Sequence, residues 1–246
     1  MSYIGKQPAV VALTASDITD GIVSNAKLAQ DIISGDTALA SEPSDTDEFL
    51  VSDSGTLKRI DYSLIKGGGS WVLVDTQTVS STPTSIEPGA VFSATYDTYV
   101  IVIRRYNNVS GGGLHFQLGT SSAYTTSGYR WNASGVGGAG SSLVTGSASA
   151  SEIDLLGGTS STYHCNSSQD CLSGVIWVHN PYNTTRTSIH AEMSWENASD
   201  VDVHINNVAA HPNTNTQHDR WKLICPSTSQ TFEATTIIQT FGVVNA

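Results

Sequence analysis

The sequence predicts a mainly β protein, with an antiparallel β-sandwich or barrel preceded by an extended stalk. Ser and Thr together make up 61 of the 246 residues, and only 13% of the residues are charged. Helix surfaces favour Glu, Lys, Gln and Arg, whereas strands and turns accept Ser, Thr, Gly and Asn. Apolar residues make up 39% of the chain and include five Trp, which is enough to bury a core.

Composition changes at the run Gly67-Gly68-Gly69. All five Trp and 16 of the 19 aromatic residues follow this run, so the part from residue 70 can form a core alone. Residues 1–69 carry too few apolar side chains for an independent globule. Their order must therefore come from other copies or from a larger assembly. We divide the chain into an N-terminal segment with a short helix (1–35), a stalk and hairpin region (36–69) and a C-terminal sandwich (70–246).

Two local elements are expected in the first part. Residues 24–33 predict a short helix, which Ser24 caps and Gly35 follows. Ten residues are marginal as a lone helix in water, so this helix either packs on its own domain or joins other copies in a small bundle. Residues 49–52 and 56–62 predict the two strands of a β-hairpin.

Alternation of apolar and polar side chains predicts the strands of the second part. Every second residue of 188–195 is apolar, and the next run places Val203 and Ile205 on its apolar face. His190 and His204 stand opposite these faces, so we expect them to face solvent or another subunit. The expected strands are 71–79, 90–95, 98–105, 113–119, 151–156, 174–180, 186–195, 201–209, 220–225 and 231–243.

The charge of the chain argues against several classes of function. The formal net charge is -11, which disfavours nucleic-acid binding and docking on an anionic membrane. No apolar run approaches the roughly 18 residues of a spanning helix, and the N-terminus shows no signal peptide. We therefore expect no nucleic-acid partner, no membrane insertion and no cofactor.

No catalytic motif stands out. Glu152 and Asp154 share a strand face and are near enough for a hydrolytic pair, but charges solvated on a strand face are the simpler interpretation. No nucleophile elbow, phosphate loop or metal-binding spacing occurs, so we expect neither an enzyme nor a metal centre. Cys165 and Cys171 are candidates for a disulfide that closes a surface loop, with free thiols and a zinc site beside His164 as the alternatives.

Three motifs stand out in the first 69 residues. They are SYIGKQPA at 2–9, ITDGIVSNAKLA at 18–29 and DEFLVSDSGTLKRI at 47–60. Together they resemble the N-terminal portions of fibre proteins of marine tailed bacteriophages. The resemblance implies that the N-terminus attaches the fibre to another virion protein, of the tail, collar or capsid.

The second part resembles the small β-sandwich heads of phage fibres. The similarity lies in FSATYDTYVIVI at 92–103 and in the ending Phe241-Gly242-Val243, whereas residues 120–172 match no pattern. It implies a jelly-roll-like β-sandwich head at the end of a parallel homotrimer. It also implies a virion protein that is assembled in the host cytoplasm.

The resemblance implies adsorption to the host, and we expect non-catalytic recognition of a bacterial surface glycan or protein by the head. A capsid or collar head-fibre or decoration protein with no receptor role, and a glycan depolymerase, are the alternatives. Aromatic rings among Ser, Gly and Asn make adaptable binding surfaces. As an alternative, such rings fill the ends of the sandwich or pack in a trimer interface. The candidate receptor-binding residues are Tyr124, Tyr129, Trp131, Tyr163 and Tyr182. The candidate attachment residues, whose short apolar tag needs a partner surface, are Tyr3, Ile4, Pro8, Val10, Val11 and Leu13.

Overall fold

The computed structural model separates into two compact units, Met1–Gly67 and Gly68–Ala246. We describe each unit by itself. The boundary between them falls within the glycine run. The structure describes residues 14–19, 37–66, 70–106, 113–137, 140, 142–157, 172–196, 203–227 and 230–244.

The described part of the N-terminal unit is a hairpin with two short helical turns. Its strands β1 (Glu48–Asp53) and β2 (Thr56–Asp61) pair antiparallel. Ser54 and Gly55 join them with φ of +52° and +85°, the left-handed pair of a two-residue hairpin turn. The helical turns are η1 (Ala15–Asp17) and α1 (Tyr62–Ile65). The helix predicted at 24–33 and the six candidate attachment residues lie outside the described residues.

None of the described residues before Gly67 is buried. Leu50, Leu57 and Leu64 are each more than two-thirds exposed. The rings of Phe49 and Tyr62 approach to 6.1 Å between centroids but leave both side chains accessible to solvent. The described part of this unit therefore buries too little apolar surface to offset the entropy of ordering its own chain.

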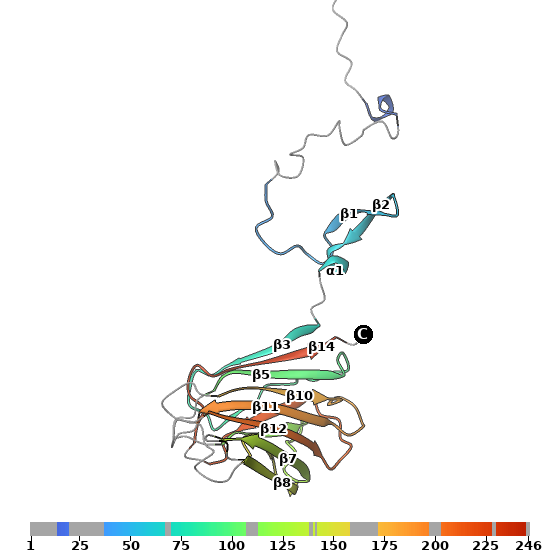
Figure 1. Ribbon diagram of the computed structural model, residues 1–246. Helices are drawn as coiled ribbons and strands as arrows, with labels where there is room; N and C mark the ends of the chain where they lie inside the picture. Colours follow the sequence, from blue (N-terminus) through green and yellow to red (C-terminus); the bar gives the residue numbers. More distant parts are fainter. Residues whose placement is uncertain are drawn as a thin grey trace, which may run out of the picture. The chain divides into compact units, whose positions relative to one another are not determined.

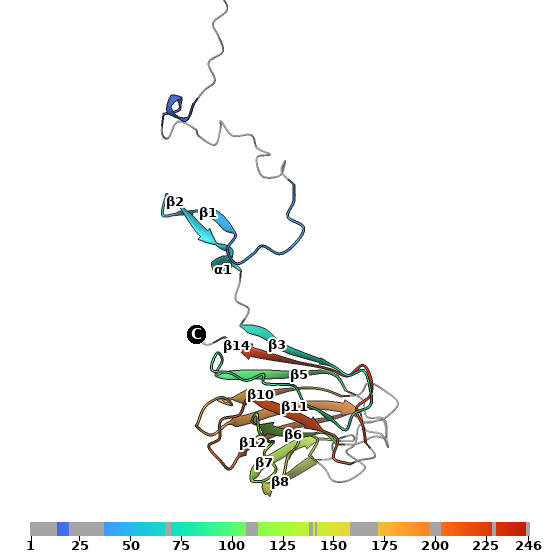
Figure 2. The same ribbon diagram turned by 180° about the vertical axis from the view of Figure 1, so that it is seen from behind.

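The C-terminal unit is a β-sandwich-like pair of antiparallel sheets, which confirms the mainly β prediction. Its strands are β3 (Trp71–Thr78), β4 (Ser85–Ile86), β5 (Thr98–Tyr106), β6 (His115–Gly119), β7 (Tyr129–Val136), β8 (Ser142–Ala150), β9 (Ile153–Asp154), β10 (Leu172–His179), β11 (Ser188–Glu196), β12 (Val203–Pro212), β13 (Arg220–Ile224) and β14 (Ile237–Val243). Eight form a sheet in the order β3-β14-β5-β10-β11-β12-β7-β8 (Figure 1). Four form a smaller sheet in the order β4-β13-β6-β9. Figure 2, seen from behind, brings β6 into view. No helix among the described residues is long and apolar enough to span a membrane.

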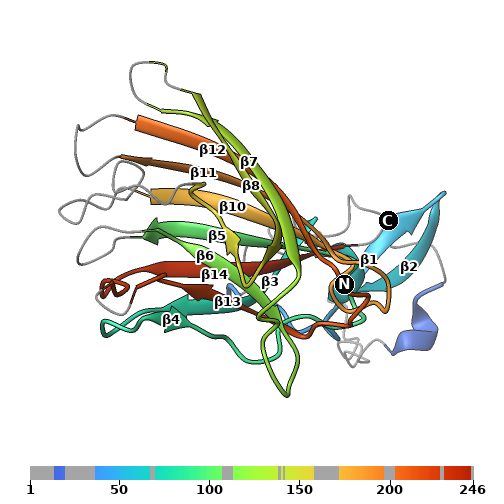
Figure 3. The same cartoon turned by 90° about the horizontal axis from the view of Figure 1, so that it is seen from below.

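The core lies between the two sheets. Every second residue of β11 from Ile189 to Trp195 is buried, as predicted, and Trp221 and Leu223 enter the core from β13. The indole Nε1 of Trp221 donates a hydrogen bond of 3.0 Å to Oγ1 of Thr240 on β14. This bond ties the smaller sheet to the larger one and identifies the face of β14 that looks inward. β3 and β8 lie at opposite edges of the larger sheet (Figure 1). Figure 3, seen from below, brings β4, β6 and β13 of the smaller sheet into one view with strands of the larger sheet.

The region 120–172, which matches no pattern in the sequence, supplies β7 and β8 at one edge of the larger sheet. The Ser, Gly and Ala side chains of β8 give weak alternation. β7 does alternate, with Tyr129, Trp131 and Ala133 buried and their neighbours exposed, although no strand is predicted there. In contrast, the strand predicted at 90–95 is wrong. The N–H groups of Val91 and Phe92 both donate to the carbonyl oxygen of Asp219 at 2.9 Å, which ladder pairing of consecutive residues does not allow.

The prediction for the faces of β12 is also wrong. Val203 and Ile205 are exposed, whereas His204 and Asn206 are buried. The ring of His204 stacks on Trp195 at 5.4 Å between centroids, and Nδ2 of Asn206 donates to the carbonyl oxygen of Leu155 at 2.9 Å. Specific partners for two polar side chains therefore reverse the face that hydropathy assigns. His190 is exposed, as expected.

The outer face of the larger sheet, the face turned away from the smaller sheet, is apolar over part of its width. Thr240 faces inward, so its neighbour Phe241 faces outward. The register places Phe241 between Leu73 of β3 and Val100 of β5, and Val100 opposite Trp177 of β10. Val100 is fully buried on this outer face, without belonging to the core between the sheets. Side chains of neighbouring strands cover it.

We expect Thr240→Val to destabilise the C-terminal unit by about 1–3 kcal/mol, because the buried Trp221 N–H then loses its acceptor at nearly constant volume. Urea unfolding followed by Trp fluorescence measures this, since all five Trp follow residue 70. Thr76→Val, at an exposed position of β3, is the control and should stay within about 0.5 kcal/mol. Equal effects of the two variants would contradict the role of the bond.

We expect the stability of the C-terminal unit to fall between pH 6.5 and about pH 4. Burial lowers the pKa of His218 from 6.5 to about 4, so the unfolded chain takes up this proton first as the pH falls. The slope should approach roughly 1.4 kcal/mol per pH unit and vanish above pH 6.5. His179, whose pKa burial also lowers, adds a change of the same sign.

Urea midpoints at pH 7 and pH 5 test this expectation. Nδ1 of His218 lies 3.2 Å from Oγ1 of Thr187, and an Asn amide reaches a similar position. His218→Asn should therefore lose stability at both values but show a smaller difference between them. An unchanged pH slope in the variant would count against His218 as its source.

Candidate functional site

The structure corrects the expectation for two of the five candidate receptor-binding aromatics. Tyr129 is fully buried and Trp131 almost so, both on β7 and in the core. The hydroxyl of Tyr129 accepts a hydrogen bond of 2.7 Å from the backbone N–H of Leu118 on β6, and burial raises its pKa. These two rings fill the sandwich and cannot contact a ligand at its surface. Tyr163 lies outside the described residues, as do Cys165 and Cys171.

Tyr124 is half-buried on the outer face of the smaller sheet. Its ring lies over Gly119, where a Cβ would approach Cδ1 of the ring to 2.6 Å. Nζ of Lys222 lies 5.1 Å from the ring centroid, within cation–π range. Burial raises the pKa of Tyr124 to about 12. The ring therefore covers a glycine gap in the sheet rather than standing free for a ligand.

Tyr182 is the most exposed candidate among the described residues. It borders a small hollow of about 120 Å³ together with Tyr96, Asp97, Asn180 and Asn183. The backbone N–H of Asn180 donates to the carbonyl oxygen of Asp97 at 2.6 Å, and Asn180 has a φ of +53°. This end of the sandwich thus presents aromatic and amide groups on a held turn, but the hollow is smaller than the roughly 300 Å³ of most ligand pockets.

Glu152 and Asp154 lie on either side of His115 and are half-buried and buried, so the interpretation as charges solvated on a strand face is wrong. Nδ1 of His115 lies 2.8 Å from Oε1 of Glu152, and Nε2 lies 3.8 Å from Oδ1 of Asp154. The hydrogen bond with His115 lowers the pKa of Glu152, whereas a general acid needs a raised pKa. Oδ1 of Asp154 accepts hydrogen bonds from the backbone N–H groups of Leu156 and Gly157, at 3.0 and 2.9 Å. The cluster therefore holds β6 against β9 and its following turn.

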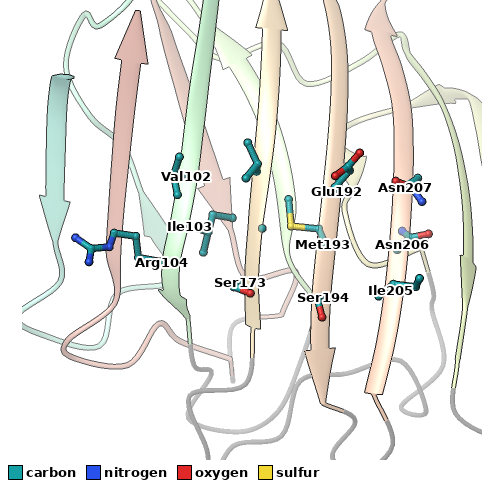
Figure 4. Close-up of a pocket in the computed structure, with 12 residues that line it drawn as sticks. Val102, Ile103, Arg104, Ser173, Glu192, Met193, Ser194, Ile205, Asn206 and Asn207 are labelled. Carbon is teal, nitrogen blue, oxygen red and sulfur yellow. The ribbon is translucent and has the colours of Figure 1, made fainter. Parts of the chain in front are cut away.

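A larger hollow of about 580 Å³ lies across β5, β10, β11 and β12 on the outer face of the larger sheet (Figure 4). Its volume falls within the range of ligand sites. Val102, Val175 and Ile205 supply apolar surface, and the polar side chains around them include Arg104, Glu192 and Asn207. We call this feature the outer-face hollow.

Sheet register fixes the polar groups of the outer-face hollow. Val102 pairs with Val175, Val175 with Glu192, and Glu192 with Asn207, so one row crosses four strands. Arg104 and Glu192 stand on β5 and β11, two strand spacings apart, or about 10 Å. The site presents a cation and a carboxylate on opposite sides of an apolar strip.

Gly174 and Met193 pack closely beneath the outer-face hollow, on the core side of the sheet. Gly174 on β10 lies beside Met193 on β11, and a Cβ at Gly174 would approach the sulfur of Met193 to 2.3 Å. The thioether therefore occupies the space that a side chain at residue 174 would need. Nη1 of Arg104 donates to Oε1 of Gln239 at 3.4 Å, a weak contact that leaves most of its donors for a ligand.

None of the candidate receptor-binding residues of the sequence lines the outer-face hollow. Alternation in 188–195 does place Glu192 opposite the buried face, and this prediction is confirmed. Glu192, Arg104 and Asn207 line the same hollow because of the lateral register of four strands. No local sequence pattern encodes this register. Among the described residues, no group of three or more His, Cys, Asp or Glu is placed to hold a metal ion.

Comparison of the chain with protein-family models, with curated proteins and with solved structures gives no match.

We expect Tyr129→Phe to destabilise the C-terminal unit by about 1–3 kcal/mol, because the N–H of Leu118 loses the hydroxyl that accepts its hydrogen bond. Tyr182→Phe, at an exposed position, should change stability by less than about 0.5 kcal/mol. Thermal and urea unfolding measure both variants. A Tyr129→Phe protein as stable as the parent would contradict a stabilising role for the hydrogen bond between Tyr129 and Leu118.

Proposed function

We propose that this protein is a fibre of a bacteriophage virion that recognises a bacterial surface glycan without cleaving it. In this proposal the chain is a parallel homotrimer. Its N-terminal segment attaches to another virion protein, and its C-terminal unit is a jelly-roll-like head. The proposal combines the sequence motifs with the chemistry of the outer-face hollow.

The observation that carries the recognition step is the outer-face hollow. Sugars present apolar C–H faces and a periphery of hydroxyl groups. Val102 and Val175 suit the apolar C–H face of a sugar. Arg104, Glu192 and Asn207 supply hydrogen-bond donors and acceptors for its hydroxyl groups. Binding sites of this kind combine an apolar lining with a few placed polar groups.

The chemistry of the outer-face hollow favours binding over hydrolysis. Glu192 is the single carboxylate among its lining residues, and glycoside hydrolysis generally uses two acids on either side of the bond. The other acidic cluster of the described residues holds Glu152 with a lowered pKa, which is unsuited to donating a proton at neutral pH. Both observations support a lectin-like role.

The N-terminal unit supports the assembly part of the proposal. None of its described residues is fully buried, and it presents exposed Leu50, Leu57 and Leu64. Such a segment gains stability only through other surfaces. Weak glycan sites on three copies, and on several fibres, would reinforce one another because later contacts form at high effective concentration.

The full chain should bind bacterial surface polysaccharides on a glycan array and release no reducing sugar from them. Arg104→Ala and Asn207→Ala should each weaken binding to the best glycan about tenfold or more. Each variant loses a hydrogen bond to the glycan, so that a polar group of the bound glycan is left desolvated without a partner. Biolayer interferometry with the immobilised glycan measures the affinities.

Arg130→Ala is the matched control, because Arg130 is an exposed cation of β7 on the same sheet. It should leave the affinity unchanged. Loss of binding in Tyr182→Ala alone would move the site to the smaller hollow. Release of reducing sugar would favour a depolymerase, and absence of any glycan binding would favour a structural decoration protein.

A further inference from the structure

An uncovered apolar surface lies at one edge of the larger sheet. Trp71 and Leu73 of β3 are 46% and 52% exposed, and the register places them opposite Val243 and Phe241 of β14. The rings of Trp71 and Phe241 approach to 5.9 Å between centroids. We call these four outward-facing residues the β3 patch.

The β3 patch stands beside an open strand edge. β3 is the first strand of the larger sheet, so one side of its backbone has no neighbouring strand in that sheet. Natural sheets protect such edges with charges, proline or covering segments, but residues 71–74 are four consecutive exposed apolar residues. A run of this kind favours aggregation of a free monomer. It therefore indicates a surface that a partner covers in the assembled protein.

The length of the linker identifies what covers the patch. The proposal here rests on the proposed homotrimer. Only residues 67–70 separate Lys66, at the end of the hairpin and helix, from Trp71, and five backbone steps span at most about 18 Å. In the proposed trimer this linker keeps the start of each β3 within that distance of Lys66 of its own chain, which favours contact between the three β3 strands.

The net charge of the chain also favours another copy of the chain as the partner of the β3 patch. The chain carries a net charge of -11, so most ways of bringing copies together place like charges against each other. The β3 patch contains no charged residue. The nearest acid on β3, Asp75, accepts hydrogen bonds from Nε2 of Gln77 at 3.1 and 2.9 Å and is half-buried. Copies can meet at this patch without carboxylate repulsion.

We propose that the β3 patches of three copies pack against one another around the threefold axis and form the interface between the heads. Trp71 and Leu73 are its central residues. The outer-face hollow begins at β5, two strands further along the sheet, so this interface leaves it open to a ligand.

Light scattering coupled to size-exclusion chromatography on the full chain tests the proposal. The parent should have a mass of three times 25.9 kDa, whereas Leu73→Glu should fall to a single chain at micromolar concentration, because three carboxylates then meet at the axis. Val144→Glu is the matched control. Val144 is 81% exposed on β8, at the opposite edge of the same sheet, and this variant should remain trimeric.

The outcomes separate the interface from the trimer itself. A monomeric parent would overturn both proposals, and a trimeric Leu73→Glu protein with native circular dichroism would overturn the interface alone. If the Leu73→Glu protein does not fold, the variant Leu73→Cys tests the interface instead. Oxidation of its trimers should give a covalent dimer on a non-reducing gel that the parent and Val144→Cys do not give, and its absence would also overturn the interface.

Discussion

The organisation of the C-terminal unit depends on one constraint, namely that a sheet of eight strands has two faces and a sheet of four strands covers one of them. The inward face is satisfied by Trp221, Leu223 and their neighbours, with the bond from Trp221 to Thr240 fixing the contact. The outward face must meet solvent or a partner. Both surfaces to which we assign a role, the outer-face hollow and the β3 patch, lie on it.

Strand periodicity predicts much of this fold but not all of it. The alternation from Ile189 to Trp195 is confirmed because every inward side chain is apolar. β12 fails because His204 and Asn206 are buried through partners on other strands, a stacked Trp195 and the carbonyl of Leu155. β8 is missed because its Gly, Ala and Ser side chains carry little hydropathic contrast, whereas the alternation of Tyr129, Trp131 and Ala133 in β7 is a signal that could have predicted a strand.

The candidate sites were less predictable than the fold, for a physical reason. Composition drew attention to aromatics among small polar residues, and that criterion does not separate a ring in the core from a ring at a surface. Tyr129 and Tyr182 look alike in sequence, yet one hydroxyl holds Leu118 inside the sandwich and the other ring borders solvent. The outer-face hollow arises from register between strands far apart in the chain, and therefore appears only once the sheet is assembled.

The pairing of β3 with β14 also has a mechanical consequence. β3 is the first strand after the linker, and seven residue pairs join it to β14 along its length. A pull on Ser70 directed along the strand axis loads these hydrogen bonds in shear, so that all must stretch together. A pull across the strand would instead open them one pair at a time, starting at Trp71 and Val243. The edge strand thus resists tension along its own axis far better than tension from the side.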